Sequence, residues 1–256
     1  AIATDRNQLL IVDPSAEGGD APIGSVDLSV FDADTDDFDS VIASDGVRIG
    51  DRVFVLLDRT RPGSRCSNQL EFLGSVLVVV DTTTDTLVDV DPATAEVDAI
   101  ALEGNTRVAR SLTFDEGTGK LYVNATGNEP CDETDDGLDG GIEIVDPASL
   151  ASEGFVTAEA DAGVSIHSFA IDPRTGEGFV LTDPTFTSSG ALDQPNRVLA
   201  WNPSTGALDT DTVVYEATER LDVLAHAGYL FVWSAENGLR AFDAETREPA
   251  FTAFDS

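Results

Sequence analysis

Two short acidic segments carry the side chains best suited to hold a cation. Carboxylates at alternate positions of the first segment can wrap their oxygens around a hard cation such as Ca²⁺. That segment lacks the glycine and glutamate spacing of an EF-hand loop. The candidate metal ligands of the two segments are Asp32, Asp34, Asp36, Asp132, Asp135 and Asp136. The sequence therefore predicts Ca²⁺ as the candidate cofactor, and the alternative is an acidic, salt-tolerant surface without metal.

Arg110 and His167 are the candidates for binding an anionic or polar ligand. Arg110 precedes the run SLTFD, and His167 precedes the similar run SFAID. An arginine and a histidine at equivalent places would form a small basic spot, because both donate hydrogen bonds to anions. The alternative is that each pairs with a neighbouring carboxylate in a structural role.

The chain lacks the common catalytic motifs. It has no G-x-S-x-G, H-E-x-x-H, Walker or dinucleotide-binding sequence, and no haem-attachment motif. Two histidines are too few for a zinc site built from three histidines. These features favour a protein without enzymatic activity.

A ten-residue phrase recurs along the chain and indicates which elements hold these residues. Each copy is an apolar run that ends in Asp or Asn and continues into a turn rich in Pro, Ser, Thr and Gly. The aligned turn residues are Asp13, Asp81, Asp146, Asn202 and Asp243. Their spacing falls from 68 to 41 residues, which is typical of a unit of about 40 residues with insertions, as in a β-propeller blade.

Each repeat reads as four short strands joined by turns. In the fourth unit the strands are expected at residues 167–172, 179–182, 197–201 and 212–216, and no stretch shows sustained helical periodicity. We therefore predict an all-β chain, residues 1–256, forming one β-propeller domain of four-stranded antiparallel blades with about five units. The first unit lacks its innermost strand. The chain is then part of a larger propeller, or a partner chain completes the first blade, or the strand phase near the ends is shifted.

Blade topology places the long insertions on one rim. The connections between second and third strands, at residues 59–74, 127–141 and 184–196, all open on that side, whereas the opposite side has tight turns. Cys66 and Cys131 are the two cysteines, and they fall in equivalent loops of adjacent blades. We expect them to form a disulfide in an oxidising compartment, and two free thiols are the alternative. Long loops on a rigid scaffold are a common place for binding.

The third unit carries the strongest family likeness. The segments GKLYVNATG at 119–127 and IEIVDP at 142–147, with IDPRTG at 171–176, resemble the YVTN-type propeller repeats of bacterial and archaeal surface proteins. The resemblance implies a closed propeller with seven or a similar number of blades, usually extracytoplasmic. It implies no reaction, since this fold hosts many functions.

Charge excludes two classes of partner. The chain has 48 acidic and 14 basic residues and a net charge of −34, so nucleic-acid phosphates and anionic membrane surfaces would repel it. The sequence has no apolar run long enough to span a membrane. We therefore expect an extracytoplasmic, non-catalytic propeller that binds a protein or polysaccharide through its long-loop rim. The alternatives are a calcium-dependent propeller hydrolase or lactonase, and a subunit or fragment of a larger assembly.

Overall fold

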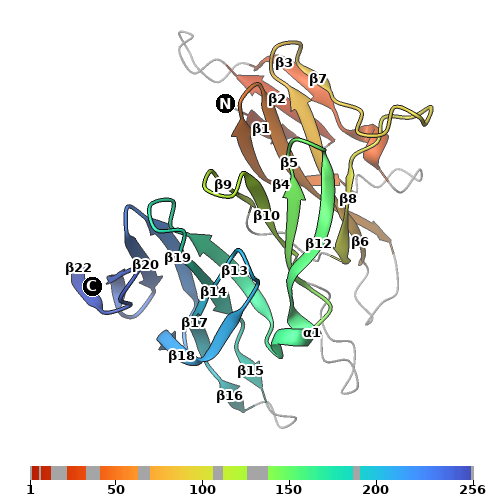
Figure 1. The fold of residues 1–256 in the computed structure, drawn as a ribbon. Helices are drawn as coiled ribbons and strands as arrows, with labels where there is room; N and C mark the ends of the chain where they lie inside the picture. The colour runs from red at the N-terminus through yellow and green to blue at the C-terminus, as the bar shows by residue number, and fades with distance from the viewer. Residues whose placement is uncertain are drawn as a thin grey trace.

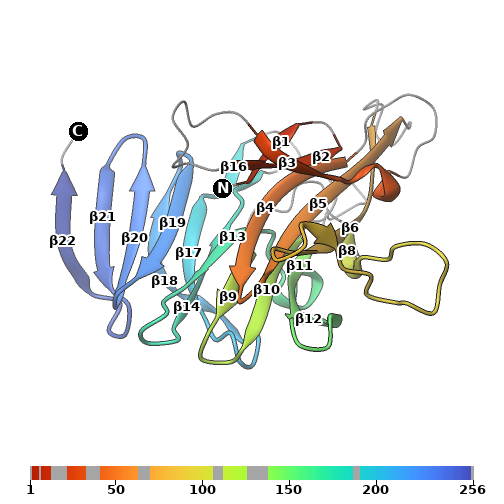
Figure 2. The same cartoon turned by 90° about the horizontal axis from the view of Figure 1, so that it is seen from above.

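The protein, seen in a computed structural model, is an all-β chain of antiparallel sheets arranged as propeller blades (Figure 1). The structure describes residues 2–5, 7–12, 22–32, 41–62, 70–105, 112–125, 138–186 and 191–254. In Figure 2 the blue C-terminal sheet stands at one end of a series of neighbouring sheets, and the red N-terminal sheet lies beside the orange strands that follow it in the chain. The predicted fold class is confirmed.

We number the blades in chain order. Blade 1 has β1 (Ile2–Asp5), β2 (Gln8–Val12) and β3 (Pro22–Asp27), followed by a 3₁₀ turn (Ser29–Phe31). Blade 2 has β4 (Val41–Ile49), β5 (Arg52–Pro62), β6 (Leu70–Asp81), β7 (Thr86–Leu87) and β8 (Ile100–Asn105). Blade 3 has β9 (Leu112–Asp115), β10 (Lys120–Ala125), β11 (Gly141–Asp146) and β12 (Ala151–Ala158), and the short helix α1 (Glu159–Ala162) follows.

The last two blades follow the same plan. Blade 4 has β13 (Ile166–Ile171), β14 (Gly178–Thr182), β17 (Asn196–Trp201) and β18 (Leu208–Ala217), with a separate hairpin of β15 (Thr185–Phe186) and β16 (Leu192–Gln194) inserted after β14. Blade 5 has β19 (Leu221–His226), β20 (Tyr229–Ser234), β21 (Gly238–Asp243) and β22 (Pro249–Phe254). Within each blade, neighbouring strands are antiparallel and consecutive, as in a meander.

In blades 2 to 5 the recurring Asp or Asn of the sequence repeat ends the third strand or directly follows it. Its Oδ1 accepts the backbone N–H two residues later, at 2.7 Å from Thr83 to Asp81 and 2.8 Å from Ala148 to Asp146. Asn202 does the same toward Ser204. Such side-chain turns favour Asp and Asn because their short side chains reach the backbone two residues on. The repeat in the sequence therefore marks the same side-chain-stabilised turn after the third strand in blades 2 to 5.

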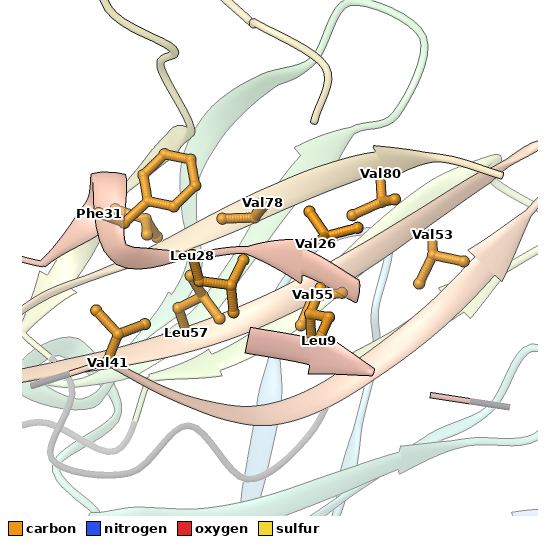
Figure 3. Packing of buried hydrophobic residues seen from close by; sticks show 11 residues of the cluster. Leu9, Val26, Leu28, Phe31, Val41, Val53, Val55, Leu57, Val78 and Val80 are labelled. Carbon is orange, nitrogen blue, oxygen red and sulfur yellow. The ribbon is translucent and has the colours of Figure 1, made fainter. Parts of the chain in front are cut away.

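Blade 1 has three strands among the described residues, as the sequence predicts. β1 lies at the edge of the sheet β1-β2-β3, where an innermost strand would pair. Leu9, Val26, Leu28 and Phe31 nevertheless pack on the valines of blade 2 (Figure 3). A hollow of about 450 Å³ remains between Leu9 and β4 and β5 of blade 2. An incomplete blade 1 is therefore held by its contact with blade 2.

Each pair of neighbouring blades shares one apolar core. The cores lie between blades 1 and 2, 2 and 3, 3 and 4, and 4 and 5. One aromatic position recurs on the second strand, as Phe54, Tyr122 and Phe179, and each of these rings is at most 1% exposed because the next blade covers it. Burial of such rings dominates the energetics of a packed interface. Each blade is thus held to the next by an apolar core between them.

The structure differs from the sequence prediction in the loop of blade 2, and it adds one detail in each of blades 2 and 3 that the sequence analysis did not specify. The predicted loop 59–74 is shorter, because β5 continues to Pro62 and β6 begins at Leu70, so that the strands form a long hairpin. The outer strand is split into β7 and β8, which both pair with β6 across the turn-rich segment 88–99. In blade 3 the outer strand ends at Ala158, and α1 follows it.

Candidate functional site

The candidate site is the long-loop rim, which we define as the side formed by the connections from second to third strands, at residues 63–69, 126–140 and 183–195, together with the strand ends that flank them. The described parts of this rim are the far end of the β5–β6 hairpin, the hairpin β15–β16 and the approach to β11. In Figure 1, β15, β16 and α1 lie together on the lower side of the molecule. Connections on this side are much longer than the tight turns opposite, such as Ala227-Gly228 between β19 and β20.

The hairpin β15–β16 presents apolar side chains to solvent. Phe186 is 62% exposed and Leu192 is 41% exposed, and the two residues are cross-strand partners. Thr185 Oγ1 donates to Asp193 Oδ2 at 3.5 Å, which joins the two strands of the hairpin. An adjacent pair of exposed apolar residues on a projecting hairpin is suited to contact a partner surface.

Buried polar side chains end the second strands at the base of the rim. Asn124 is fully buried, and its Nδ2 donates to the carbonyl oxygen of His167 in the next blade at 2.9 Å. Thr182 Oγ1 accepts the N–H of Arg197 at 3.3 Å, and Ser234 Oγ accepts the N–H of Asn237 at 2.9 Å. These bonds satisfy backbone groups where the chain leaves the sheets. They hold the base of the rim rigid, and they make Asn124 unsuitable for glycosylation despite its Asn-Ala-Thr context.

His167 pairs with a carboxylate in its own blade. Its Nδ1 lies 2.7 Å from Asp183 Oδ1, and the imidazole side chain is 18% exposed. Ser165 Oγ donates to the other oxygen of Asp183 at 3.2 Å. In a Ser–His–Asp triad the histidine stands between the other two groups, whereas here the carboxylate does. The arrangement orients the ring but does not activate the serine through it.

Glu159, at the start of α1, is the most perturbed group at the base of the rim. Burial raises the pKa of Glu159 to about 8, and the carboxylates of Asp139 and Asp183 add to the rise. The N–H groups of Ile166, at 2.5 Å, and Gly140, at 3.1 Å, oppose it by donating to the two carboxyl oxygens. Glu159 is fully buried, so it fixes the chain on both sides of α1 and does not face a ligand. The sequence analysis missed it, and nothing in its local pattern singles it out.

Glu143 on β11 is a second buried acid that the sequence analysis missed. Its oxygens accept the backbone N–H groups of Gly104 at 2.6 Å and Glu103 at 3.0 Å, both on β8 of blade 2. Burial raises the pKa of Glu143, and these hydrogen bonds oppose the rise. A signal existed in the sequence, because an acid interrupts the apolar run Ile142-Glu-Ile-Val. Glu143 joins blades 2 and 3 and is structural.

Most of the predicted site residues lie outside the described part of the chain. They are Arg110, Asp34, Asp36, Asp132, Asp135, Asp136, Cys66 and Cys131. The basic spot, the calcium loops and the disulfide therefore stay predictions.

Asp32 is the one predicted metal ligand that the structure describes. It follows the 3₁₀ turn of blade 1, and its Oδ2 accepts the Nδ2 of Asn7 at 3.4 Å. Its charge also acts on Arg59: burial lowers the pKa of the Arg59 guanidinium, and Asp32 opposes this. A guanidinium within reach competes with a metal ion for the same carboxylate.

Among the residues that the structure describes, no group of three or more His, Cys, Asp or Glu side chains gathers in a way that could hold a metal ion. The described helices include none that is long and apolar enough to cross a membrane.

Comparison of the sequence with family models and with curated proteins identifies no family. No family model matches the chain, and no curated protein matches it. The resemblance to YVTN-type repeats therefore stays a prediction.

Solved structures do match. The β-propeller domain of Cps50 (Swd1) from Myceliophteria thermophila is similar to this chain at 15% identity and a TM-score of 0.52, over 93% of this chain and 64% of that one. A computationally designed protein, Ika8, is similar at 10% identity and a TM-score of 0.49, over all of this chain and 61% of the other. The chain thus spans under two thirds of the length of both structures. The likeness to the Cps50 (Swd1) domain shows a β-propeller fold and says nothing of function.

Proposed function

We propose that this chain is a non-catalytic, extracytoplasmic β-propeller that binds a protein or polysaccharide through its long-loop rim. The observation that carries the proposal is the projecting hairpin β15–β16, which holds Phe186 and Leu192 in solvent above a rigid sheet. Exposed apolar side chains that gather in a patch rimmed by polar residues mark interaction surfaces. The rigid base formed around Asn124, Glu159 and Thr182 keeps such anchors preorganised, which lowers the entropy cost of binding.

Chemistry at the rim supports binding over catalysis. The His167–Asp183 pair has its acid between the imidazole and Ser165, so it does not form a nucleophilic relay. Glu159, the first residue of α1, is fully buried and its carboxyl oxygens accept backbone N–H groups. The acidic composition and the predicted disulfide support an extracytoplasmic location, because disulfides persist in oxidising compartments.

The experiment compares a rim variant with a matched surface variant. The rim variant is Phe186→Ser with Leu192→Ser, and the control is Val97→Ser, which changes a 37% exposed side chain on the outer edge of blade 2. Wild type and variants are tested on immobilised cell-surface polysaccharides and on purified envelope proteins of the source organism.

We expect the rim variant to lose about tenfold or more in affinity, or about 1.4 kcal/mol, for the ligand that wild type binds. The control should bind as wild type does. Equal binding by all three proteins would rule out the hairpin as the contact surface.

A further inference from the structure

The outer face of blade 5, which we define as the side of β19–β22 turned away from blade 4, carries a band of exposed apolar side chains. Leu224 is 62% exposed, Phe251 49%, Trp233 47% and Tyr229 38%. In Figure 2 this blade stands at one end of the series of sheets, with β22 outermost. Among the described residues, the core clusters include none that covers this face, since the cluster of blade 5 lies toward blade 4.

The band crosses the whole sheet. Leu224, Phe231, Ala241 and Phe251 are direct cross-strand neighbours on four consecutive strands. The rings of Tyr229, Phe231 and Phe251 contact one another, with centroids 6.0–6.5 Å apart in tilted and edge-on pairs. The row itself holds no acid, and Asp222 and Asp243 flank it as the cross-strand partners of Trp233 and Tyr229.

Phe231 occupies the position that is buried between blades elsewhere in the ring. Phe54, Tyr122 and Phe179 each pair with the residue two places before the turn Asp or Asn of the third strand, namely Val79, Ile144 and Ala200. Phe231 pairs with Ala241, two places before Asp243. The first three rings are at most 1% exposed because the following blade covers them. Blade 5 therefore carries an aromatic side chain, Phe231, at the interblade position, and the described residues include no following blade to cover it.

We infer that the outer face of blade 5 is an interblade interface, and that its occupant is a further blade of the same repeat, an antiparallel sheet with an aliphatic inward face. Continuity supports this occupant, because four interblade cores precede it in the chain and three of them contain the equivalent aromatic ring. The matched propeller domain is also longer, since this chain aligns to 64% of it. The binding function of the rim is not needed for this inference.

A second copy of the chain fits the face less well. Each copy carries a net charge of −34, which opposes association of two copies. Closing two five-blade arcs into one ring would also exceed the usual range of about 4–8 blades.

The test extends the chain beyond Ser256 with a duplicate of its own residues 218–254, in which the copy of Trp233 is changed to Phe. The duplicate supplies Leu221, Leu230 and Val232, the side chains with which blade 5 already packs on blade 4. The chain has two tryptophans, of which Trp201 is 2% and Trp233 47% exposed, so quenching of tryptophan emission by acrylamide reports on Trp233.

We expect the extension to lower the quenching constant about threefold and to shift the emission to shorter wavelength, because a packed interface excludes water from its core. Phe231→Asp in the extended chain should abolish the protection, and the matched Val97→Asp should not. The unextended chain should stay monomeric by sedimentation with Trp233 quenchable.

Two results would overturn the inference. One is a duplicate that folds by circular dichroism, or fails to fold, and leaves Trp233 as quenchable as before. The other is protection of Trp233 in the unextended chain that grows with protein concentration together with dimer formation, which would assign the face to a second copy.

Discussion

Oδ2 of Asp172 accepts the backbone N–H of Gly228 at 2.7 Å and so joins the first turn of blade 4 to the first turn of blade 5. Its other oxygen, Oδ1, accepts the N–H groups of Arg174 and Thr175 within the turn. Burial would raise the pKa of Asp172, but these hydrogen bonds outweigh it and lower the pKa below the usual 3.8. The same turn residue thus shapes a hairpin and connects two blades.

Replacing Asp172 by Asn should therefore separate the two roles. Asn202 shows that an amide oxygen can hold the turn, so the loss falls on Oδ2, where an amide N–H would face the N–H of Gly228. We expect Asp172→Asn to lower the free energy of unfolding by about 1–3 kcal/mol, measured by urea denaturation. Asp243→Asn is the control, since the hydrogen bonds described for the Asp243 side chain lie within its own turn and its charge reaches blade 4 only through Arg174, so its cost should stay under about 0.5 kcal/mol. Equal costs would contradict the interblade role.

Replacing Phe179 by alanine should lower the free energy of unfolding more than replacing Phe186, which lies in the inserted hairpin of blade 4. Phe179 is fully buried against blade 5, whereas Phe186 is 62% exposed on the hairpin β15–β16. Truncating a buried ring leaves a cavity, so Phe179→Ala should cost about 3–5 kcal/mol in urea denaturation. Phe186→Ala should change the same quantity by under about 0.5 kcal/mol. A small effect at Phe179 would mean that blades 4 and 5 do not pack as described.

Stability should fall as pH rises from about 4.5 to 8 because of Glu159. Its pKa is raised from 4.5 to about 8 in the folded protein, so in this window the folded state holds a proton that the unfolded state has lost. Its contribution is fully present below pH 4.5 and is lost as pH passes through about 8. Glu159→Gln, a neutral replacement, should flatten the dependence of Tm on pH across this window.

The matched control for that experiment is Asp161→Asn, an exposed acid of the same helix. It should leave the slope of Tm against pH unchanged. An unaltered slope in the Glu159→Gln variant would show that Glu159 is ionised in the folded protein at neutral pH.

Cys66 and Cys131 should form a disulfide, which a count of free thiols can test. We expect no free thiol in the denatured, unreduced protein and two after reduction, counted by a thiol reagent. A bridge that closes a loop of about 65 residues stabilises by roughly 4 kcal/mol in the chain-entropy model, so reduction should lower Tm. A Cys66→Ser, Cys131→Ser variant should match the reduced protein. Two reactive thiols before reduction would contradict the predicted equivalence of the two loops.

Calcium should raise Tm if the predicted acidic segments bind it, because a ligand that binds only the folded state stabilises it. The measurement is Tm with added Ca²⁺ and with chelator, in wild type and in two variants, Asp34→Asn with Asp36→Asn and Asp135→Asn with Asp136→Asn. The Ca²⁺-dependent shift should vanish in whichever variant removes the site. A shift that is the same in all three proteins, or absent in wild type, would leave these segments as an acidic surface.

The strand plan could be predicted from sequence because turn chemistry is local. Asp81, Asp146 and Asn202 mark the end of a third strand in every case, since an Asx side chain bonds only to backbone a few residues away. The missing innermost strand of blade 1 followed from the same counting. The split of the outer strand of blade 2 into β7 and β8 did not, because pairing with β6 across segment 88–99 depends on contacts far apart in the chain.

The sequence by itself determined the repeated sheet, the side on which the long connections open and the strongly acidic charge of the chain. Only the tertiary structure decided what His167, Glu143 and Glu159 do, because their partners, Asp183, Gly104 and Ile166, meet them through strand register and blade packing. It also decided that Phe54, Tyr122 and Phe179 are covered while the band around Phe231 is left open. A covered and an uncovered aromatic side chain look the same in a sequence, because burial depends on which neighbouring blade the fold places against each of them.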